Sequence, residues 1–319
     1  MTLDHPRMAA IRQQAYGGPE VLELVEVDRP RPRPTEVLVR VLACGVNPVD
    51  WKVRAGGRFL SPPMTVGWDI CGVVEEVGAG VTRFQPGDDV FGMPRFPGEA
   101  GGYAQYVTAR SRQLARKPAA LSHEEAAGLP LAGLTAWQIL VDTAYVQPGQ
   151  RILVTAAGGG VGHLAVQLGK ALGAHVTATA RADKHPVLRE LGADEVIDYT
   201  AVDAPAAVRD LHPDGLDLVV DAVGGSGTVA WLPALRPGGL LVPVAGGAGV
   251  VDEATRAGVR IASVLVEPDY AGLEGLAGLV DAGQLRVLVQ EVLPLSEAAR
   301  AHAIGEQGRT LGKLVLKPW

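Results

Sequence analysis

A short apolar run, a glycine-rich turn and a helical pattern follow one another directly over residues 151–173. Residues 151–155 (RILVT) have the length and β-branched content of a buried strand. Apolar residues then recur at the spacing of one helix face until a glycine ends the pattern: Val161, Leu164, Ala165, Leu168, Leu172 and Gly173. This order of strand, turn and helix predicts a βαβ unit, and therefore a parallel sheet covered by helices.

Five further strand candidates continue the alternation: residues 175–179, 195–198, 216–221, 240–244 and 260–265. Six strands separated by helices suit an α/β fold with a doubly wound parallel Rossmann sheet. Before residue 121, short β-branched runs separated by Gly and Pro are typical of a mostly antiparallel β domain. After Pro268 a helix and short strands follow that have no place in a parallel sheet. We therefore expect a discontinuous β domain over residues 1–123 and 267–319, and an α/β domain over residues 124–266.

The composition of the chain limits its possible partners and its expected cellular location. Its 319 residues exceed the usual size of one core, and its net charge of −6 comes from interspersed charges, which argues against nucleic acid or an anionic membrane as a partner. No apolar run reaches the roughly 18 to 20 residues of a membrane helix, and the first residues lack the apolar core of a secretory signal. Because the cysteines are Cys44 and Cys71 alone, a disulfide framework is excluded, inert thiols are favoured over a redox role, and a cytoplasmic location is expected.

The turn TAAGGGVG matches a dinucleotide-binding fingerprint, with Ala157, Gly159 and Gly162 at its three positions. Glycine is needed because a β-carbon would hold the backbone N–H groups away from a pyrophosphate resting on the helix N-terminus, and because the helix must approach the strand closely. A plain strand–helix turn is the alternative, although the flanking strand and helix supply the context that the fingerprint requires. We expect the phosphates to contact Ala157, Gly159, Gly160, Val161 and Gly162.

The end of the second predicted strand indicates which nucleotide binds. An NAD site requires an acid there to hold the ribose 2′-OH. The segment TATARADKH instead has Ala180 at this position, with Arg181 and Lys184 just after it and Asp183 between them. Two cations can pair with a 2′-phosphate, so NADPH is favoured over NADH; the alternative is that both are solvated charges at a helix start.

A series of motifs occurs along nearly the whole chain: YGGPEVLEL, CGVNPVDWKVRAG, GWDICGVVEEVGAGVTRFQPGDDVFG, GGYAQYV, LPLAGLTAWQIL, AAGGGVG, DAVGG, LRPGG and GRTLGKLVL. In this order and spacing, the chain resembles the medium-chain dehydrogenase/reductase superfamily, and within it the zinc-independent branch of quinone oxidoreductases and enone or alkenal reductases. The resemblance implies that the β domain is a GroES-like catalytic domain and that the α/β domain binds a dinucleotide.

Zinc-dependent members of that superfamily hold a catalytic zinc with a cysteine, a Gly-His-Glu motif and a further ligand. In this sequence the cysteine position is Asn47, the histidine position is Trp68 and the glutamate position is Asp69. Tryptophan cannot bind zinc and neutral asparagine is a poor ligand. The seven histidines show no compensating cluster with cysteines or acids in the sequence, so we expect no metal. Trp68 is expected to line the substrate cleft or to pack behind it, and Asp69 to cap or pair locally.

The resemblance and the altered ligand positions together imply hydride delivery without a metal. Direct alcohol oxidation becomes a poor expectation without a Lewis acid, whereas a conjugated carbon is already electrophilic. We therefore expect NADPH-dependent reduction of small-molecule quinones or of the C=C bond of α,β-unsaturated carbonyls. The alternatives are an enoyl-thioester reductase and a non-catalytic nucleotide-binding sensor or structural protein. Relatives also imply a homodimer through residues 260–265, since an uncovered apolar edge strand is a liability.

The catalytic candidates Asn47, Asp50 and Lys52 lie in the segment NPVDWK, at positions that line the nicotinamide and substrate cleft in relatives. The amide of Asn47 can donate to the nicotinamide ribose or to a substrate oxygen. Lys52 is the expected cation near a developing oxyanion, and the alternative is an exposed lysine paired with Asp50. Enoyl-thioester reductases use a tyrosine as proton donor where this chain has Arg58 and Phe59, so the proton donor stays unassigned.

Matches to relatives imply further cofactor contacts. Thr135 in LAGLTAW matches a threonine at the nicotinamide end, although a helix-start hydroxyl would look the same. Tyr199 in VIDYT matches a tyrosine near the adenosine 2′-phosphate, with a half-buried packing tyrosine as the alternative. Val223, Ala245 and Gly246 follow strands at the sheet edge where doubly wound folds bind ligands.

Overall fold

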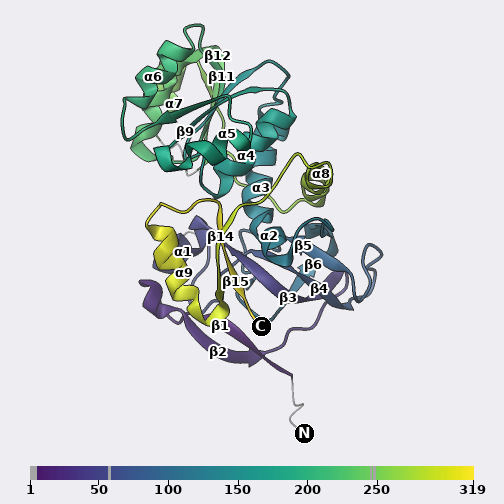
Figure 1. Cartoon of the computed structure of the whole chain (residues 1–319). Coiled ribbons are helices and arrows are strands. Elements are labelled where there is room, and N and C mark those ends of the chain that lie inside the picture. The colour runs from purple at the N-terminus through teal and green to yellow at the C-terminus, as the bar shows by residue number, and fades with distance from the viewer. Residues whose placement is uncertain (1–5, 57–58, 245, 247–248) are drawn as a thin grey trace. The chain divides into compact units, whose positions relative to one another are not determined.

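Two compact units make up the computed structural model of the chain, which describes residues 6–56, 59–244, 246 and 249–319 (Figure 1). The first unit comprises Met1–Leu134, Glu267–Ala282 and Val287–Trp319, and the second comprises Thr135–Val266 and Gly283–Arg286. This division differs from the expected boundaries, because residues 124–134 join the first unit. There helix α2 (His123–Gly128) packs on strands β3 (Glu36–Val46) and β4 (Asp69–Val77).

The first unit contains a mostly antiparallel sheet, as the sequence predicts. Its other strands are β1 (Arg7–Arg12), β2 (Glu23–Asp28), β5 (Asp89–Gly92), β6 (Tyr106–Arg110), β7 (Leu114–Arg116), β14 (Val289–Pro294) and β15 (Lys313–Lys317). The large sheet has the order β14-β15-β3-β4-β5-β7 with β6 paired to β3, and β1 pairs with β2 separately. Because β15 pairs with β14 on one side and β3 on the other, residues 313–317 form an inner strand of this sheet. The helices are α1 (Pro48–Gly56), α8 (Tyr270–Asp281) and α9 (Ala298–Glu306), with the short turns η1 (Pro19–Val21), η2 (Ser111–Gln113) and η6 (Leu295–Glu297).

The second unit contains the predicted doubly wound parallel sheet. Its strands are β8 (Arg151–Val154), β9 (His175–Ala180), β10 (Glu195–Asp198), β11 (Leu216–Asp221), β12 (Leu235–Pro243) and β13 (Arg260–Ile261), in the order β10-β9-β8-β11-β12-β13. The helices are α4 (Gly160–Ala171), α5 (His185–Glu190), α6 (Ala204–Leu211) and α7 (Val251–Arg256), with the non-α helical segments η3 (Gln138–Thr143), η4 (Ala182–Lys184) and η5 (Gly225–Ala234). Helix α3 (Pro130–Trp137) contains the junction between the units.

Two predicted strand limits in this sheet are wrong. The strand predicted at 240–244 begins at Leu235, because Leu235 pairs with Leu216 before the Pro-Gly-Gly segment shifts the register, and pairing resumes at Leu240. The strand predicted at 260–265 is limited to Arg260–Ile261, because the chain leaves the sheet edge once Ala262 N has bonded to Leu241 O. The apolar edge is therefore shorter than the sequence suggests.

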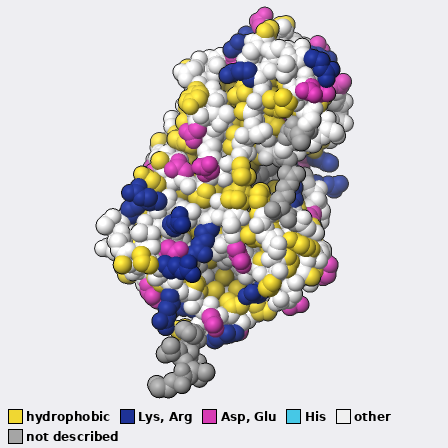
Figure 2. Space-filling model, turned by 180° about the vertical axis from the view of Figure 1, so that it is seen from behind, with side chains coloured by type: hydrophobic (Ala, Val, Ile, Leu, Met, Phe, Trp, Pro, Cys, Tyr) yellow, Lys and Arg dark blue, Asp and Glu magenta, His cyan; other side chains and the backbone are white. Residues whose placement is uncertain are grey.

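No helix among the described residues is both long and apolar enough to cross a membrane. On the face shown in Figure 2, basic and acidic side chains are interspersed with apolar ones. The pattern fits the mixed charges read from the sequence.

Candidate active site

The glycine-rich turn between β8 and α4 has the close packing that a dinucleotide loop requires. Gly159 is the N-cap of α4, and its N–H bonds to Ala156 O at 2.8 Å. A β-carbon on Gly162 would lie 2.4 Å from Ala156 O and 2.6 Å from Ala157 Cα, so a side chain there would displace the backbone of the turn. The helix N-terminus and the turn therefore form a cradle for an anion, built from backbone groups.

Basic side chains lie beside this turn. Arg181 directly follows β9, and its Nε donates to the hydroxyl of Tyr199 at 3.3 Å; both side chains are exposed. The stem of Lys184 lies over the turn, because a β-carbon on Gly158 would meet Lys184 Cδ at 2.5 Å. Burial lowers the pKa of Lys184, and Asp183 opposes that effect. The structure thus brings Arg181, Lys184 and Tyr199 together at one corner of the unit.

Asp221 is a residue of this region that the sequence analysis missed. Its buried carboxylate accepts hydrogen bonds from Thr155 Oγ1 at 2.8 Å and Thr228 Oγ1 at 2.6 Å. It also accepts from the backbone N–H of Val223 at 3.1 Å and of Gly224 at 3.2 Å. Asp221 therefore ties the end of β8 to the turn that presents the exposed Val223. The Asp in the motif DAVGG, directly after an apolar run, was the available signal.

The remaining cofactor candidates occupy varied settings. Thr135 is buried on α3, and Gly246 is exposed with a φ of 97°, a conformation that favours glycine. Ala245 lies outside the described residues. The cofactor contacts of Thr135, Ala245 and Gly246 stay predictions, since no interaction described within either unit tests them.

The first unit holds a fully buried polar cluster formed by Asn47, Asp69 and Lys313. Asn47 Nδ2 donates to Asp69 Oδ2 at 2.8 Å, and Lys313 Nζ donates to Asn47 Oδ1 and lies 3.3 Å from Asp69 Oδ2. The strand register creates the cluster: Val46 pairs with Leu314 on β15, and Gly45 pairs with Asp69 on β4. No side chain in it is more than 2% exposed. Lys313 was missed by the sequence analysis, because the lysine in LGKLVL reads as an ordinary strand-end cation.

Asp69 has the local role expected of it, whereas the expected position of Trp68 at or behind a substrate cleft stays a prediction. Trp68 is fully buried, donates from Nε1 to Gly98 O at 2.8 Å, and packs edge-to-face on Phe96 at 5.3 Å between ring centroids. Asp69 Oδ1 accepts from the N–H of Leu131 at 2.7 Å, in the first turn of α3. The carboxylate therefore caps a helix and also pairs with the cluster.

A second chain of buried groups runs from Asp50 to the surface. Asp50 Oδ2 accepts from the Tyr103 hydroxyl at 2.9 Å, and the Tyr103 oxygen lies 3.2 Å from His302 Nε2. His302 Nδ1 lies 3.2 Å from Arg54 Nη1, and Arg54 Nη2 donates to Glu306 Oε1 at 2.6 Å. One arrangement satisfies all these bonds: neutral His302 carries its proton on Nε2, and Tyr103 donates to Asp50.

Burial dominates the acid–base properties of this chain. It raises the pKa of Asp50 to about 7, although hydrogen bonds from Asn47 N and Tyr103 oppose the rise. It lowers the pKa of His302 to about 3, with help from the Arg54 guanidinium, and raises the pKa of Tyr103 well above its ordinary value. Asp50 Oδ1 is buried with no hydrogen-bond partner among the described residues. Asp50 is therefore the group that can carry a proton near neutral pH.

Lys52 does not join either buried group. It is exposed on α1, whereas Asp50 on the same helix is fully buried and bonds to Asn47 N and Tyr103. Within the described part of the chain, the alternative of a Lys52–Asp50 ion pair is therefore absent. Among the described residues of this unit, the buried cations in these two groups are Lys313 and Arg54.

Comparison with known proteins places this arrangement in a family. Residues 33–119 match the family model "Alcohol dehydrogenase GroES-like domain", and residues 191–316 match "Zinc-binding dehydrogenase". The chain is 35% identical to the chloroplast envelope quinone oxidoreductase homolog of Arabidopsis thaliana, over 98% of both chains.

Solved structures agree with the sequence comparison. The quinone oxidoreductase of Escherichia coli, solved in complex with NADPH, superposes with a TM-score of 0.89 at 31% identity, covering 97% of this chain and 100% of that one. A structure described as an NAD-dependent alcohol dehydrogenase superposes equally well, with a TM-score of 0.89 at 37% identity, covering 97% and 99%. The chain therefore belongs to the medium-chain dehydrogenase/reductase superfamily, in its quinone oxidoreductase branch.

Proposed function

We propose that this oxidoreductase uses NADPH to deliver hydride, without a metal, to quinones or to the C=C bond of α,β-unsaturated carbonyls. The observation that carries the proposal is the buried cluster of Asn47, Asp69 and Lys313, in which Asn47 and Asp69 stand at positions that the family resemblance assigns to zinc ligands. The set offers an amide, one carboxylate and an ammonium group. It has no thiolate or imidazole, and an ammonium donor beside the only carboxylate opposes a dication.

The second unit supports the choice of cofactor. The cradle, whose close backbone packing a β-carbon on Gly162 would disrupt, suits a pyrophosphate, and Arg181, Lys184 and Tyr199 beside it suit a 2′-phosphate. Bound NADPH would supply the hydride. Thr135, Val223 and Gly246 are retained as proposed contacts with the rest of the cofactor.

Hydride transfer to the substrate places negative charge on its oxygen. Hydrogen-bond donors must stabilise this charge until a proton is added. Lys313 donates to the carbonyl oxygen of the Asn47 amide, and Asp69 takes one of its N–H groups, so the orientation of the amide is fixed. The second amide N–H is then the donor for the oxygen, and the exposed Lys52 adds positive charge. We assign Asp50 as the proton store, since burial brings its pKa to about 7.

A substrate panel tests the proposal. Oxidation of NADPH is followed by absorbance with a quinone, a small enone, an alkenal and a crotonyl thioester, each with and without the protein. We expect turnover with the quinone, the enone or the alkenal. Preference for the thioester would replace the proposal by an enoyl-thioester reductase, and binding of NADPH without oxidation of any substrate would favour a sensor.

Oligomeric state and location complete the proposal. A homodimer through the edge at residues 260–265 is supported by the exposed Leu265, and light scattering that gives a monomer mass at micromolar concentration would contradict it. A cytoplasmic location is supported by Cys44 and Cys71, which are both fully buried free thiols whose pKa values are raised by burial.

A further inference from the structure

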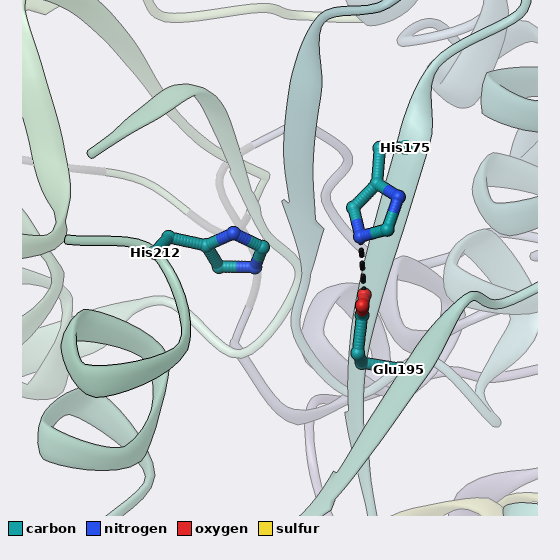
Figure 3. A group of neighbouring side chains, drawn as sticks. All are labelled: His175, Glu195 and His212. Carbon is teal, nitrogen blue, oxygen red and sulfur yellow. Dashed lines mark ion pairs between the residues drawn. The ribbon is translucent and has the colours of Figure 1, made fainter. Parts of the chain in front are cut away.

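Three side chains converge at the amino ends of β9 and β10, away from the glycine-rich turn. His175 and Glu195 are the first residues of these neighbouring parallel strands, and His212 follows the last residue of α6 (Figure 3). One possible ligand atom from each of the three lies within 4.8 Å of the others. Three separate segments of the second unit therefore present two imidazoles and a carboxylate to one point.

Hydrogen bonds already hold these groups in place. His175 Nε2 lies 2.6 Å from Glu195 Oε2, the contact dashed in Figure 3. The hydroxyl of Thr177, which is fully buried on β9, lies 2.8 Å from His212 Nε2 and 3.3 Å from Glu195 Oε2. The two imidazole rings meet edge-to-face, with centroids 5.8 Å apart. Because the sheet and Thr177 fix the side chains, little conformational entropy is lost when a ligand is bound.

The surroundings bury one ligand and pair the nearby cations with carboxylates. His212 is 5% exposed. Arg151 pairs with Asp214 at 3.4 Å. Lys170 likewise pairs with Asp194, at 2.9 Å.

Asp194 also places a carboxylate behind His175, slightly beyond hydrogen-bond distance. Its Oδ2 lies 3.7 Å from His175 Nδ1, on the side of the ring opposite the Nε2 that faces Glu195. The N–H of Val176 donates to the same carboxylate at 2.7 Å and holds it in position. A carboxylate behind the imidazole fixes the ring and its tautomer in many metal sites.

We propose that His175, Glu195 and His212 form a binding site for a borderline divalent transition-metal ion, with Zn²⁺ as the expected occupant. Two nitrogens and one carboxylate oxygen leave the fourth tetrahedral position for water. With zinc–ligand bonds of about 2.0–2.1 Å, ligand atoms sit about 3.3 Å apart. Small side-chain rotations reach this geometry. The distance between His175 and Glu195 must lengthen, and the distances from these two residues to His212 must shorten. The ion takes the place of the proton on His175 Nε2, and the neutral imidazole then carries its proton on Nδ1, on the side of Asp194.

The site lies at the opposite end of the strands from the cofactor cradle. His175 pairs with Arg151 at the start of β8, whereas the glycine-rich turn follows the end of β8. An ion here would link β9, β10 and the end of α6 without contacting the nucleotide. It should therefore raise the melting temperature of the protein and leave the KM for NADPH unchanged.

Calorimetric titration of the untagged, chelator-treated and dialysed full chain with zinc chloride tests the proposal. We expect one ion per chain, a higher melting temperature with zinc, and tetrahedral cobalt bands in the visible spectrum when Co²⁺ replaces Zn²⁺. Glu195→Gln, which keeps the shape of a partly exposed side chain, and His212→Ala should each weaken binding at least tenfold. His123→Ala, which removes a histidine paired with Asp89 at 3.1 Å in the other unit, is the matched control.

Two results would overturn the proposal. One is the absence of saturable zinc binding to the unaltered full chain. This result does not depend on whether any variant folds. The other is binding that Glu195→Gln and His212→Ala leave unchanged while circular dichroism shows both variants folded, because the ion would then sit on other histidines. Neither result depends on turnover or on the proposed substrate.

Discussion

The candidate sites of the two units are formed by different kinds of chemical group. In the second unit, the cradle consists of backbone N–H groups and glycines, with the exposed Arg181 at its side. In the first unit, the site consists of charged and polar side chains that are almost fully buried, including Lys313 and Asp50. The nucleotide region can therefore lose one side chain at modest cost, whereas the buried cluster cannot, because each charge in it depends on a partner.

This difference also explains how each region responds to solvent. Exposed cations beside the cradle are screened by salt and contribute mainly to the choice of nucleotide. Burial instead changes the acid–base chemistry of the first unit, where the pKa of Asp50 rises to about 7 and that of His302 falls to about 3. Four variants test the contrast, from the largest expected effect to the smallest.

Replacing Lys313 should have the largest effect. Lys313→Met leaves Asp69 and Asn47 without their cation, and removing one partner of a buried pair costs about 3–5 kcal/mol of unfolding free energy. Lys317→Met is the matched control, because Lys317 lies on the same strand with its side chain 45% exposed, paired with Glu124. Denaturant unfolding of both variants measures the difference.

A double variant separates charge from packing at this position. Lys313→Met combined with Asp69→Asn leaves no uncompensated charge in the cluster. The double variant should therefore recover part of the unfolding free energy that Lys313→Met loses, and it should recover none of the kcat that Lys313→Met loses. Equal stability of Lys313→Met and Lys317→Met would show that the buried cluster has no special dependence on its cation.

Asp50→Asn should change the pH dependence of stability. Between the ordinary pKa of 3.8 and the folded value of about 7, folded Asp50 holds a proton that the unfolded chain has released. The free energy of unfolding therefore falls as pH rises through this window, by up to about 1.4 kcal/mol per pH unit, and the asparagine variant lacks this contribution. Urea unfolding at several pH values measures both slopes.

An exposed carboxylate provides the comparison for Asp50. Asp28→Asn changes a side chain that is 65% exposed, so its slope should match that of the unaltered protein. If Asp50→Asn also matched it, Asp50 would not carry a proton at neutral pH, and its proposed role as proton store would fail. A loss of kcat in Asp50→Asn with little change in the KM for NADPH would support that role.

Gly162→Ala should weaken nucleotide binding through the backbone. The added β-carbon meets Ala156 O at 2.4 Å, so the turn must move, at a cost of about 1–3 kcal/mol. Gly227→Ala in the same unit is the control, since a β-carbon there meets nothing within 4 Å. Calorimetric titration with NADPH should show at least tenfold weaker binding for Gly162→Ala alone; unchanged affinity would mean that the cradle is not the phosphate site.

Arg181→Ala should have the smallest effect, confined to the choice of nucleotide. Loss of one charge-assisted bond to a 2′-phosphate corresponds to a rise of about tenfold in the KM for NADPH, with the KM for NADH unchanged. Arg189→Ala, at an exposed arginine on α5, is the control. Equal changes in the KM for NADPH and for NADH would show that Arg181 does not contact the 2′-phosphate. They would favour NADH as the cofactor, in line with the description of one structural relative as an NAD-dependent alcohol dehydrogenase.

The sequence predicted the parts of the molecule that local patterns control. The strand before the glycine-rich turn, the helix over Gly160–Ala171 and the Gly173 stop follow from short-range periodicity and from the conformations open to glycine. The limits of β12 and β13 were wrong because tertiary pairing decided them. A Pro-Gly-Gly segment that looks like a turn lies within β12, and the edge strand β13 ends at Ile261 although its partner β12 continues to Pro243.

The candidate sites divide in the same way. Arg181, Lys184 and the glycines could be named because they follow strand ends, where doubly wound sheets bind ligands. Lys313 could not, because its partner Asn47 is far away in the chain, and the pairing depends on the register of β3 with β15. The link from Asp50 through Tyr103 to His302 likewise joins segments that only the folded sheet brings together.

The central claim is that the buried cluster of Asn47, Asp69 and Lys313 works in place of a metal. Its most direct test is the rate of quinone-dependent NADPH oxidation after exhaustive chelation and dialysis, with zinc then added back. The account predicts the same kcat before chelation, after chelation and after zinc addition, even if zinc binds at His175, Glu195 and His212. A rate that is lost on chelation and restored by zinc would contradict it.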